Sequence, residues 1–166
     1  FISIGHVLDG SSFAHDSQRG FTDARPMTAT DVRRLTSEGF LIGSHGVHHE
    51  DFGTLDAGQA DRVLAESRRL IGEVSGQLPE HFSFPKGKRG TNITAHTFGL
   101  ALKHYRYVHS AYGGYNVPST DRRHFVRIGN PVDRLDLAML MDGYTGARAV
   151  LAGDAWGMRT NDFHPY

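Results

Sequence analysis

The sequence contains no cysteine, has no excess of charge of either sign and has no long apolar run. Without cysteine, disulfides, thiolate metal sites and cysteine nucleophiles are excluded, so any metal site must use His, Asp or Glu. The 18 Lys and Arg residues balance the 18 Asp and Glu residues, which disfavours nucleic acid as a partner. No stretch approaches the ~18 consecutive apolar residues of a membrane span.

The composition is that of a globular chain with many candidate metal ligands. Its 166 residues are 39% hydrophobic and 22% charged, and they include 11 His and 20 Gly. We interpret residues 1–166 as one domain, because no repeat or linker divides them. The chain begins with Phe1, and residues 1–5 have the pattern of a strand. We therefore expect a fragment or a processed chain whose own N-terminus lies upstream.

Predicted strands alternate with predicted helices along the chain. Apolar or alternating runs predict strands at residues 1–5, 40–43, 81–84, 107–108 and 125–126. Capping pairs and apolar stripes predict helices at residues 28–39, 56–76, 92–105 and 135–151. A polar loop is expected over residues 9–25. This alternation favours a parallel sheet or an α/β barrel, with functional groups at the C-terminal ends of the strands.

The densest group of histidines follows the predicted strand at residues 40–43. His45 stands at the end of that strand, and His48 and His49 come shortly after it. Residues four apart in a strand are ~13 Å apart, so the chain must turn after His45 if His49 is to share a metal with it. Gly46 suits such a turn. We expect His48 to point away, and solvated loop histidines are the alternative interpretation.

The order of these motifs resembles that of the polysaccharide deacetylases, a carbohydrate esterase family with a distorted (β/α) barrel. The segment from Ile42 to Asp51 resembles the family's histidine motif, and the segment from Phe82 to Gly87 resembles its aromatic and proline turn. Arg127 is similarly placed to a later arginine motif. The resemblance covers roughly residues 1–135. It implies a barrel of this type, incomplete at the N-terminus because its first strand would precede Phe1.

The resemblance also implies roles for individual residues. His45 and His49 would bind a divalent metal, for which zinc is the expected ion. Pro85 and Phe84 would line the substrate groove, although the residue pattern favours burial of the Phe84 ring in the core. The backbone N–H of Lys86 would stabilise the oxyanion. These alternatives for Phe84 stay open at the level of sequence.

Further positions connect the resemblance to catalysis or depart from it. Arg127 would orient the catalytic carboxylate, whereas a surface or packing role is the alternative. Ser83 stands where some members have arginine, and Lys86 stands where an aromatic residue is common. The family's Asp-Asp pair, which supplies the third ligand and the general base, would lie upstream of Phe1. His164 is a weak candidate for the late catalytic histidine.

The sequence therefore predicts a metal-dependent hydrolase that removes N- or O-acetyl groups from a carbohydrate polymer. Without the Asp pair, residues 1–166 alone are expected to be inactive. A catalytically inactive carbohydrate-binding or structural barrel is the main alternative. An amidohydrolase-like zinc barrel is weaker, because no His-x-His pair is visible. A cell-envelope or extracellular location is what the resemblance favours.

Overall fold

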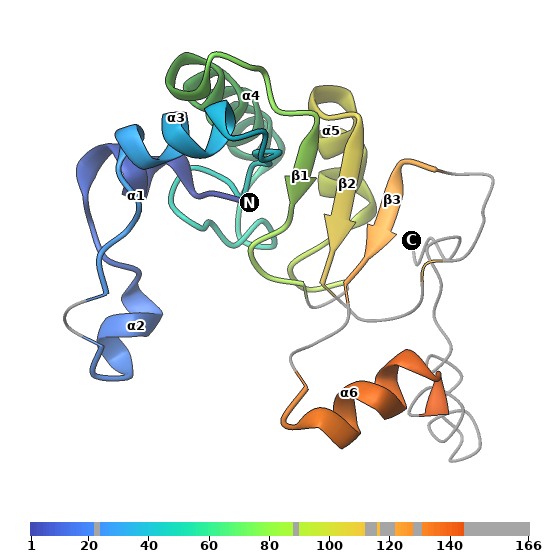
Figure 1. Ribbon diagram of the computed structural model, residues 1–166. Coiled ribbons are helices and arrows are strands. Elements are labelled where there is room, and N and C mark those ends of the chain that lie inside the picture. Colours follow the sequence, from blue (N-terminus) through green and yellow to red (C-terminus); the bar gives the residue numbers. More distant parts are fainter. Residues whose placement is uncertain (22–23, 88–89, 112–115, 117–121, 128–130, 145–166) are drawn as a thin grey trace.

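The described part of the chain has a mixed α/β architecture with a parallel sheet (Figure 1). The computed structural model describes residues 1–21, 24–87, 90–111, 116, 122–127 and 131–144. Strands β1 (His81–Ser83), β2 (Tyr107–Ser110) and β3 (His124–Val126) form a sheet in the order β1-β2-β3. Both pairings are parallel. The predicted α/β class and these three strands are confirmed.

Two more segments extend the sheet beyond β1 through isolated bridges. Ser44 pairs in parallel with Phe82 on one side and with Ile2 on the other. The N–H of Ser44 donates to the carbonyl of His81, and the N–H of His45 donates to the carbonyl of Ile2, each over 2.8 Å. The parallel array therefore runs in chain order from Ile2 to β3. Within the described residues it remains an open array, and a closed barrel is not formed by them.

The helices begin where the capping residues predict. α3 (Ala29–Ser37) and α4 (Ala57–Ser75) each start with a complete capping box, formed by Thr28 with Asp31 and by Asp56 with Gln59. α4 ends at Gly76, which has a left-handed backbone. The other helices are α1 (Ile4–Asp9), α2 (Ala14–Gln18), α5 (Ala95–His104) and α6 (Arg134–Met141). None of the described helices is long and apolar enough to cross a membrane.

The core lies between one face of the sheet and the helices α4 and α5. Phe82 of β1 and Val108 of β2 are fully buried in one cluster with Leu64 of α4 and Ala101 of α5. A second cluster joins the start of the chain to α3 and α4; its buried members are Ile2, Ile4, Val7, Val32, Val47, Ile71 and Val74. These clusters fix the strand segments, and with them the strand ends that carry the candidate site.

Two predicted strands are wrong. Residues 40–43 form no strand, and Phe40 and Leu41 are 59% and 86% exposed. The run is apolar, but within the described part of the chain no segment pairs with it before Ser44, so its first side chains face solvent. Residues 1–5 contribute a single bridge at Ile2, after which α1 begins at Ile4. The apolar residues at the start of the chain are therefore explained by the burial of the first turn of α1 as well as by a strand.

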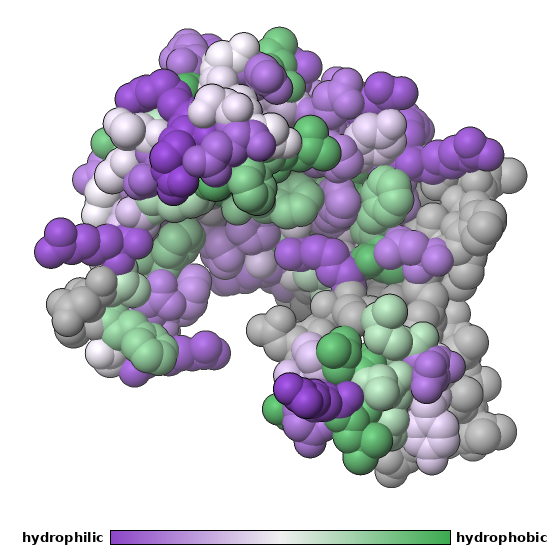
Figure 2. All heavy atoms as spheres, in the orientation of Figure 1, coloured by the Kyte–Doolittle hydropathy of each residue, from purple (hydrophilic) through white to green (hydrophobic). Residues whose placement is uncertain are grey.

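Two peripheral helices project from the body of the molecule (Figures 1 and 2). α2 lies within the stretch predicted as a polar loop, and none of its residues is buried. α6 exposes apolar side chains, including Leu135 and Met141, which are 69% and 70% exposed. The predicted last helix is thus found over its first part, whereas residues 145–151 lie outside the described residues.

Candidate active site

His45 stands at the C-terminal end of the bridged segment, immediately after Ser44. Its Nδ1 lies 2.7 Å from the carbonyl oxygen of Ser83 on the adjoining strand β1. A carbonyl oxygen can only accept, so Nδ1 carries the proton in the neutral ring and Nε2 keeps its lone pair. Burial is the largest cause that lowers the pKa of His45 to about 4. The imidazole is therefore neutral near pH 7, in the tautomer that a metal ligand requires.

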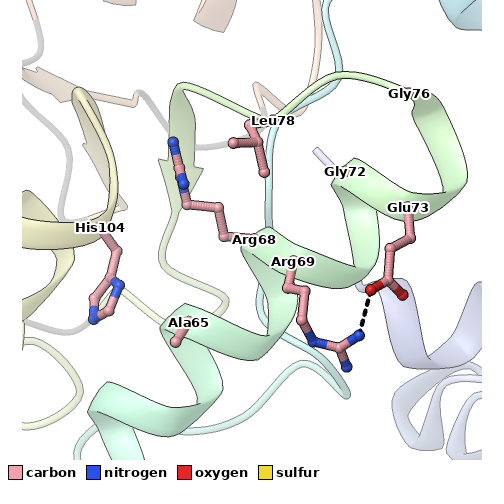
Figure 3. A pocket seen from close by; sticks show the side chains of 8 residues that line it. All are labelled: Ala65, Arg68, Arg69, Gly72, Glu73, Gly76, Leu78 and His104. Carbon is pink, nitrogen blue, oxygen red and sulfur yellow. Dashed lines mark hydrogen bonds and ion pairs between the residues drawn. The ribbon is translucent and has the colours of Figure 1, made fainter.

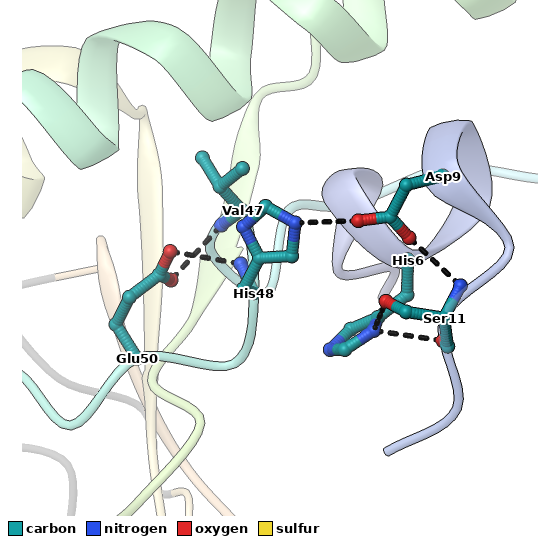
Figure 4. A network of polar contacts seen from close by, with 6 residues as sticks. All are labelled: His6, Asp9, Ser11, Val47, His48 and Glu50. Carbon is teal, nitrogen blue, oxygen red and sulfur yellow. Dashed lines mark hydrogen bonds and ion pairs between the residues drawn. The ribbon is translucent and has the colours of Figure 1, made fainter. Parts of the chain in front are cut away.

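The chain turns directly after His45. Gly46 has a φ of 82°, in the left-handed region that favours glycine. The carboxylate of Glu50 accepts hydrogen bonds from the backbone N–H groups of Val47 and His48, over 3.0 Å and 2.8 Å (Figure 4). His49 also has a positive φ, of 60°, which is uncommon for a residue other than glycine. The turn thus brings His49 back beside His45.

The structure places the rings of His45 and His49 side by side. Their centroids are 5.0 Å apart and their planes meet at 74°. Two imidazoles bound through nitrogen to one tetrahedral zinc have centroids roughly 5 Å apart, given nitrogen–zinc distances of ~2.1 Å. The pKa of His49 is lowered by burial first and then by the nearby His15 and Lys86. Among the described residues, no three His, Asp or Glu side chains converge in a way that suits a metal ion.

His48 points in a different direction from His45 and His49. Its Nε2 lies 3.0 Å from a carboxylate oxygen of Asp9 in α1 (Figure 4). The ring also packs closely on Gly5, where a methyl group would overlap the imidazole. His48 therefore ties the histidine turn to α1, as a bystander to the His45 and His49 pair.

The Pro85 and Lys86 turn follows β1 at the same end of the sheet as the histidine turn. The ammonium of Lys86 lies 3.3 Å from the carboxylate of Asp51, which also accepts hydrogen bonds from Asn92. The side chain of Phe84 is fully buried and packs edge-on against Phe52. A direct contact of the Phe84 ring with substrate does not fit this burial.

Arg127 reaches across the strand ends from the segment that follows β3. Its backbone N–H donates to the carbonyl of Ser110, and its Nη2 donates to the carbonyl of Phe84 over 2.8 Å. Its positive charge is one cause of the lowered pKa of His45. Among the described residues, Nε of Arg127 and the hydroxyl of Ser83 have no hydrogen-bond partner although both atoms are buried. The strand ends therefore hold a partly buried cation with spare hydrogen-bonding capacity.

A cavity of about 580 Å³ opens beside His49. Residues of α2 and its approach line one side of it, and the histidine turn with Lys86 lines the other. The lining residues are His6, Ser12, Phe13, Ala14, His15, Gln18, His48, His49 and Lys86. His6 and His15 belong to none of the motifs that the sequence singles out. No spacing signal could have placed them here, because α2 meets the turn only in three dimensions.

A second cavity, of about 430 Å³, lies on α4 and shares no lining residue with the first (Figure 3). Arg68, Arg69 and His104 line it, and Arg69 is paired with Glu73 over 2.6 Å. It contains none of the residues predicted to act in catalysis. His164, the weak candidate for a late catalytic histidine, lies outside the described residues.

Comparisons with known proteins identify the family to which the chain belongs. The family model of the polysaccharide deacetylases matches residues 21–103, which is half of the chain. The peptidoglycan deacetylase of Helicobacter pylori is 28% identical over 109 residues, covering 65% of this chain and 34% of that protein. The chain thus spans about a third of the length of that curated relative.

Two solved structures share the fold. The Streptococcus pyogenes deacetylase PplD, solved in complex with acetate, aligns with a TM-score of 0.60 and 14% identity, over 84% of this chain and 56% of that one. A polysaccharide deacetylase from Bacillus cereus aligns with a TM-score of 0.52 and 12% identity, over 64% and 33% of the two chains. With a family model that matches half of its length, the chain belongs to the polysaccharide deacetylase family.

Proposed function

We propose that the protein is a metal-dependent hydrolase that removes N- or O-acetyl groups from a carbohydrate polymer. The observation that carries this proposal is the facing pair of His45 and His49 at the C-terminal end of a parallel array. Sites of α/β proteins gather at such strand ends. The Helicobacter pylori relative is named a peptidoglycan deacetylase, which supports an acetylated wall polysaccharide as the class of substrate.

The donor set of this chain fits a divalent metal, for which zinc is the proposed ion. The Ser83 carbonyl fixes the proton of His45 on Nδ1 and leaves Nε2 free, which is the usual arrangement of a ligating histidine. The His49 ring lies at the separation that a shared ion requires. The chemistry that a bound divalent metal supplies to such a reaction is polarisation of the acetyl carbonyl and activation of a water molecule.

Other residues at the strand ends have proposed roles in positioning. Pro85 shapes the groove wall, and the backbone N–H of Lys86 donates to the developing oxyanion. The guanidinium of Arg127, held by the Phe84 carbonyl, orients the carboxylate that acts as general base. The presence of that carboxylate and of a third metal ligand stays a prediction. A strand paired with Ile2 on the side away from Ser44 would be a suitable place for both.

The test is acetate release from an N-acetylated and an O-acetylated oligosaccharide, with and without added zinc or cobalt, by the longest natural chain that contains residues 1–166. We expect release to depend on the metal and to fall at least ~100-fold in His45→Ala and His49→Ala, as for loss of a metal site. His104→Ala is the matched control, because His104 lies on α5, where its imidazole pairs with Asp61 away from the histidine turn. Its activity should stay within a few-fold of the parent protein.

Two results would contradict the proposal. Release that persists at full rate in His45→Ala would show that the histidine pair does not carry the chemistry. Binding of the oligosaccharides without any acetate release, in protein loaded with either metal, would favour a carbohydrate-binding domain instead. The same assay on residues 1–166 alone tests the expectation that these residues are inactive by themselves.

A further inference from the structure

One wall of the cavity beside His49 lies outside the residues that the family model matches. We call residues 11–20 the α2 segment; it precedes the family match at residues 21–103. The α2 segment supplies five of the nine lining residues: Ser12, Phe13, Ala14, His15 and Gln18. The volume of about 580 Å³ lies within the ~300–1,000 Å³ of small-molecule sites. The cavity therefore has room for a sugar unit beside the histidine pair.

Aromatic contacts hold the α2 segment against the histidine turn. The Phe13 ring lies 4.1 Å from the ring of His6 and 5.8 Å from that of His49, between centroids. The His15 ring lies 5.6 Å from that of His49. Phe13 is partly exposed and lines the cavity. The Phe13 ring and the His15 imidazole thus both lie next to His49, a proposed metal ligand.

Carboxylates lie next to the basic side chains around the cavity. His48 is paired with Asp9 over 3.0 Å, and Lys86 is paired with Asp51 over 3.3 Å. His15 lies 3.4 Å from the carboxylate of its neighbour Asp16. An anionic ligand would have to compete with these carboxylates. The lining offers hydrogen-bonding groups and an aromatic face, and its lysine is paired with a carboxylate, which suits an uncharged, hydroxyl-rich ring.

We propose that this cavity is a saccharide subsite in which the α2 segment selects the uncharged sugar unit that adjoins the acetyl-bearing unit. Phe13 supplies the stacking surface for that sugar, and His15 supplies a hydrogen bond to one of its hydroxyl groups. This proposal rests on the proposed function, because it assigns the acetyl-bearing unit to the histidine pair. It makes the α2 segment a specificity-determining wall of the substrate groove.

The test compares substrates that do or do not reach the subsite. kcat/KM is measured for an uncharged N-acetylated tetrasaccharide and for the corresponding N-acetylated monosaccharide. In Phe13→Leu, which keeps apolar bulk against His6, and in His15→Ala, the ratio of the two kcat/KM values should fall about tenfold. Phe21→Ala is the matched control, since Phe21 is 60% exposed and does not line the cavity. The ratio in that variant should stay at the parent value.

The outcomes separate this proposal from the proposed function. Equal losses on both substrates, or a ratio that falls as much in Phe21→Ala, would overturn the subsite. Tighter binding of a tetrasaccharide that carries uronic acid units would also overturn it. If the longest natural chain that contains residues 1–166 releases no acetate, the proposed function fails, and calorimetric binding of the uncharged tetrasaccharide still decides the subsite. Binding that weakens in Phe13→Leu supports it, and no binding to the parent protein overturns it.

Discussion

Replacing Gly46 by alanine is expected to disrupt the turn that brings His45 and His49 together. Gly46 has a φ of 82°, and the left-handed region costs a residue with a Cβ ~1–2 kcal/mol. A methyl group at this position would also overlap the carboxylate of Glu50. That carboxylate accepts hydrogen bonds from two consecutive backbone N–H groups of the turn. The substitution therefore acts on the backbone and on its anchor at once.

The two contributions can be separated with a second glycine. Hydrogen bonds to charged groups contribute ~1.5–3 kcal/mol each, and less where solvent reaches them, as it does at the half-buried Glu50. Weakening both bonds to Glu50 should cost ~1–3 kcal/mol, so Gly46→Ala should lower the free energy of unfolding by ~2–5 kcal/mol. Gly76 has a φ of 77° and no atom within 4 Å of a built Cβ. Gly76→Ala should therefore cost only the backbone part, ~1–2 kcal/mol.

Urea denaturation of the two variants measures this difference, and cobalt titration measures its effect on the site. Cobalt affinity should fall at least ~10-fold in Gly46→Ala, because His49 can no longer hold its place beside His45. It should stay at the parent value in Gly76→Ala, since Gly76 lies at the end of α4. Equal destabilisation by the two substitutions would refute the reasoning, because Glu50 would then not anchor the turn.

Three further predictions concern stability. Phe84→Ala should lower the free energy of unfolding, measured by urea denaturation, by ~3–5 kcal/mol, because the ring is fully buried. In the same assay, Phe40→Ala should change it by less than ~0.5 kcal/mol, because Phe40 is 59% exposed. Asp56→Ala should lower the free energy of unfolding by ~0.5–2 kcal/mol through loss of the α4 cap. An unchanged thermal unfolding temperature would contradict the role of that cap. Burial lowers the pKa of His109 to about 4, so the unfolded chain, with a histidine pKa of ~6.5, binds the proton more readily. The free energy of unfolding should therefore fall as the pH is lowered from about 6.5 to about 4, and His109→Gln should make that decline shallower in urea titrations across this range.

The local features of the fold could be predicted because neighbouring residues decide them. The capping boxes at Thr28 and Asp56 each need a side chain and a partner three residues later, and both are found as predicted. The turn at Gly46 follows from the same kind of reasoning. A glycine after the first histidine permits the left-handed backbone that a spacing of four residues requires.

The misjudged segments depend on what lies next to them in space. Residues 40–43 have the composition of a buried strand, yet Phe40 and Leu41 are exposed because pairing begins at Ser44. The start of the chain is apolar because α1 buries Ile4 in the core. Composition alone does not distinguish one buried helical turn from a short buried strand.

The candidate site depends partly on neighbouring residues, as in the turn at Gly46, and partly on contacts between segments that are distant in the sequence. The distant contacts depend on the register of the sheet. The proton of His45 is fixed by the carbonyl of Ser83, 38 residues away along the chain, and the guanidinium of Arg127 is held by the carbonyl of Phe84, 43 residues away. Side chains alternate between the two faces of a strand, so a slip of one residue in the pairing of Ser44 with Phe82 would turn His45 toward the helical layer. The burial of Phe82 against α4 and α5 opposes that slip. Packing of Phe82 against the helices therefore helps to determine that Nε2 of His45 is the free nitrogen. No local motif in the sequence reveals this dependence.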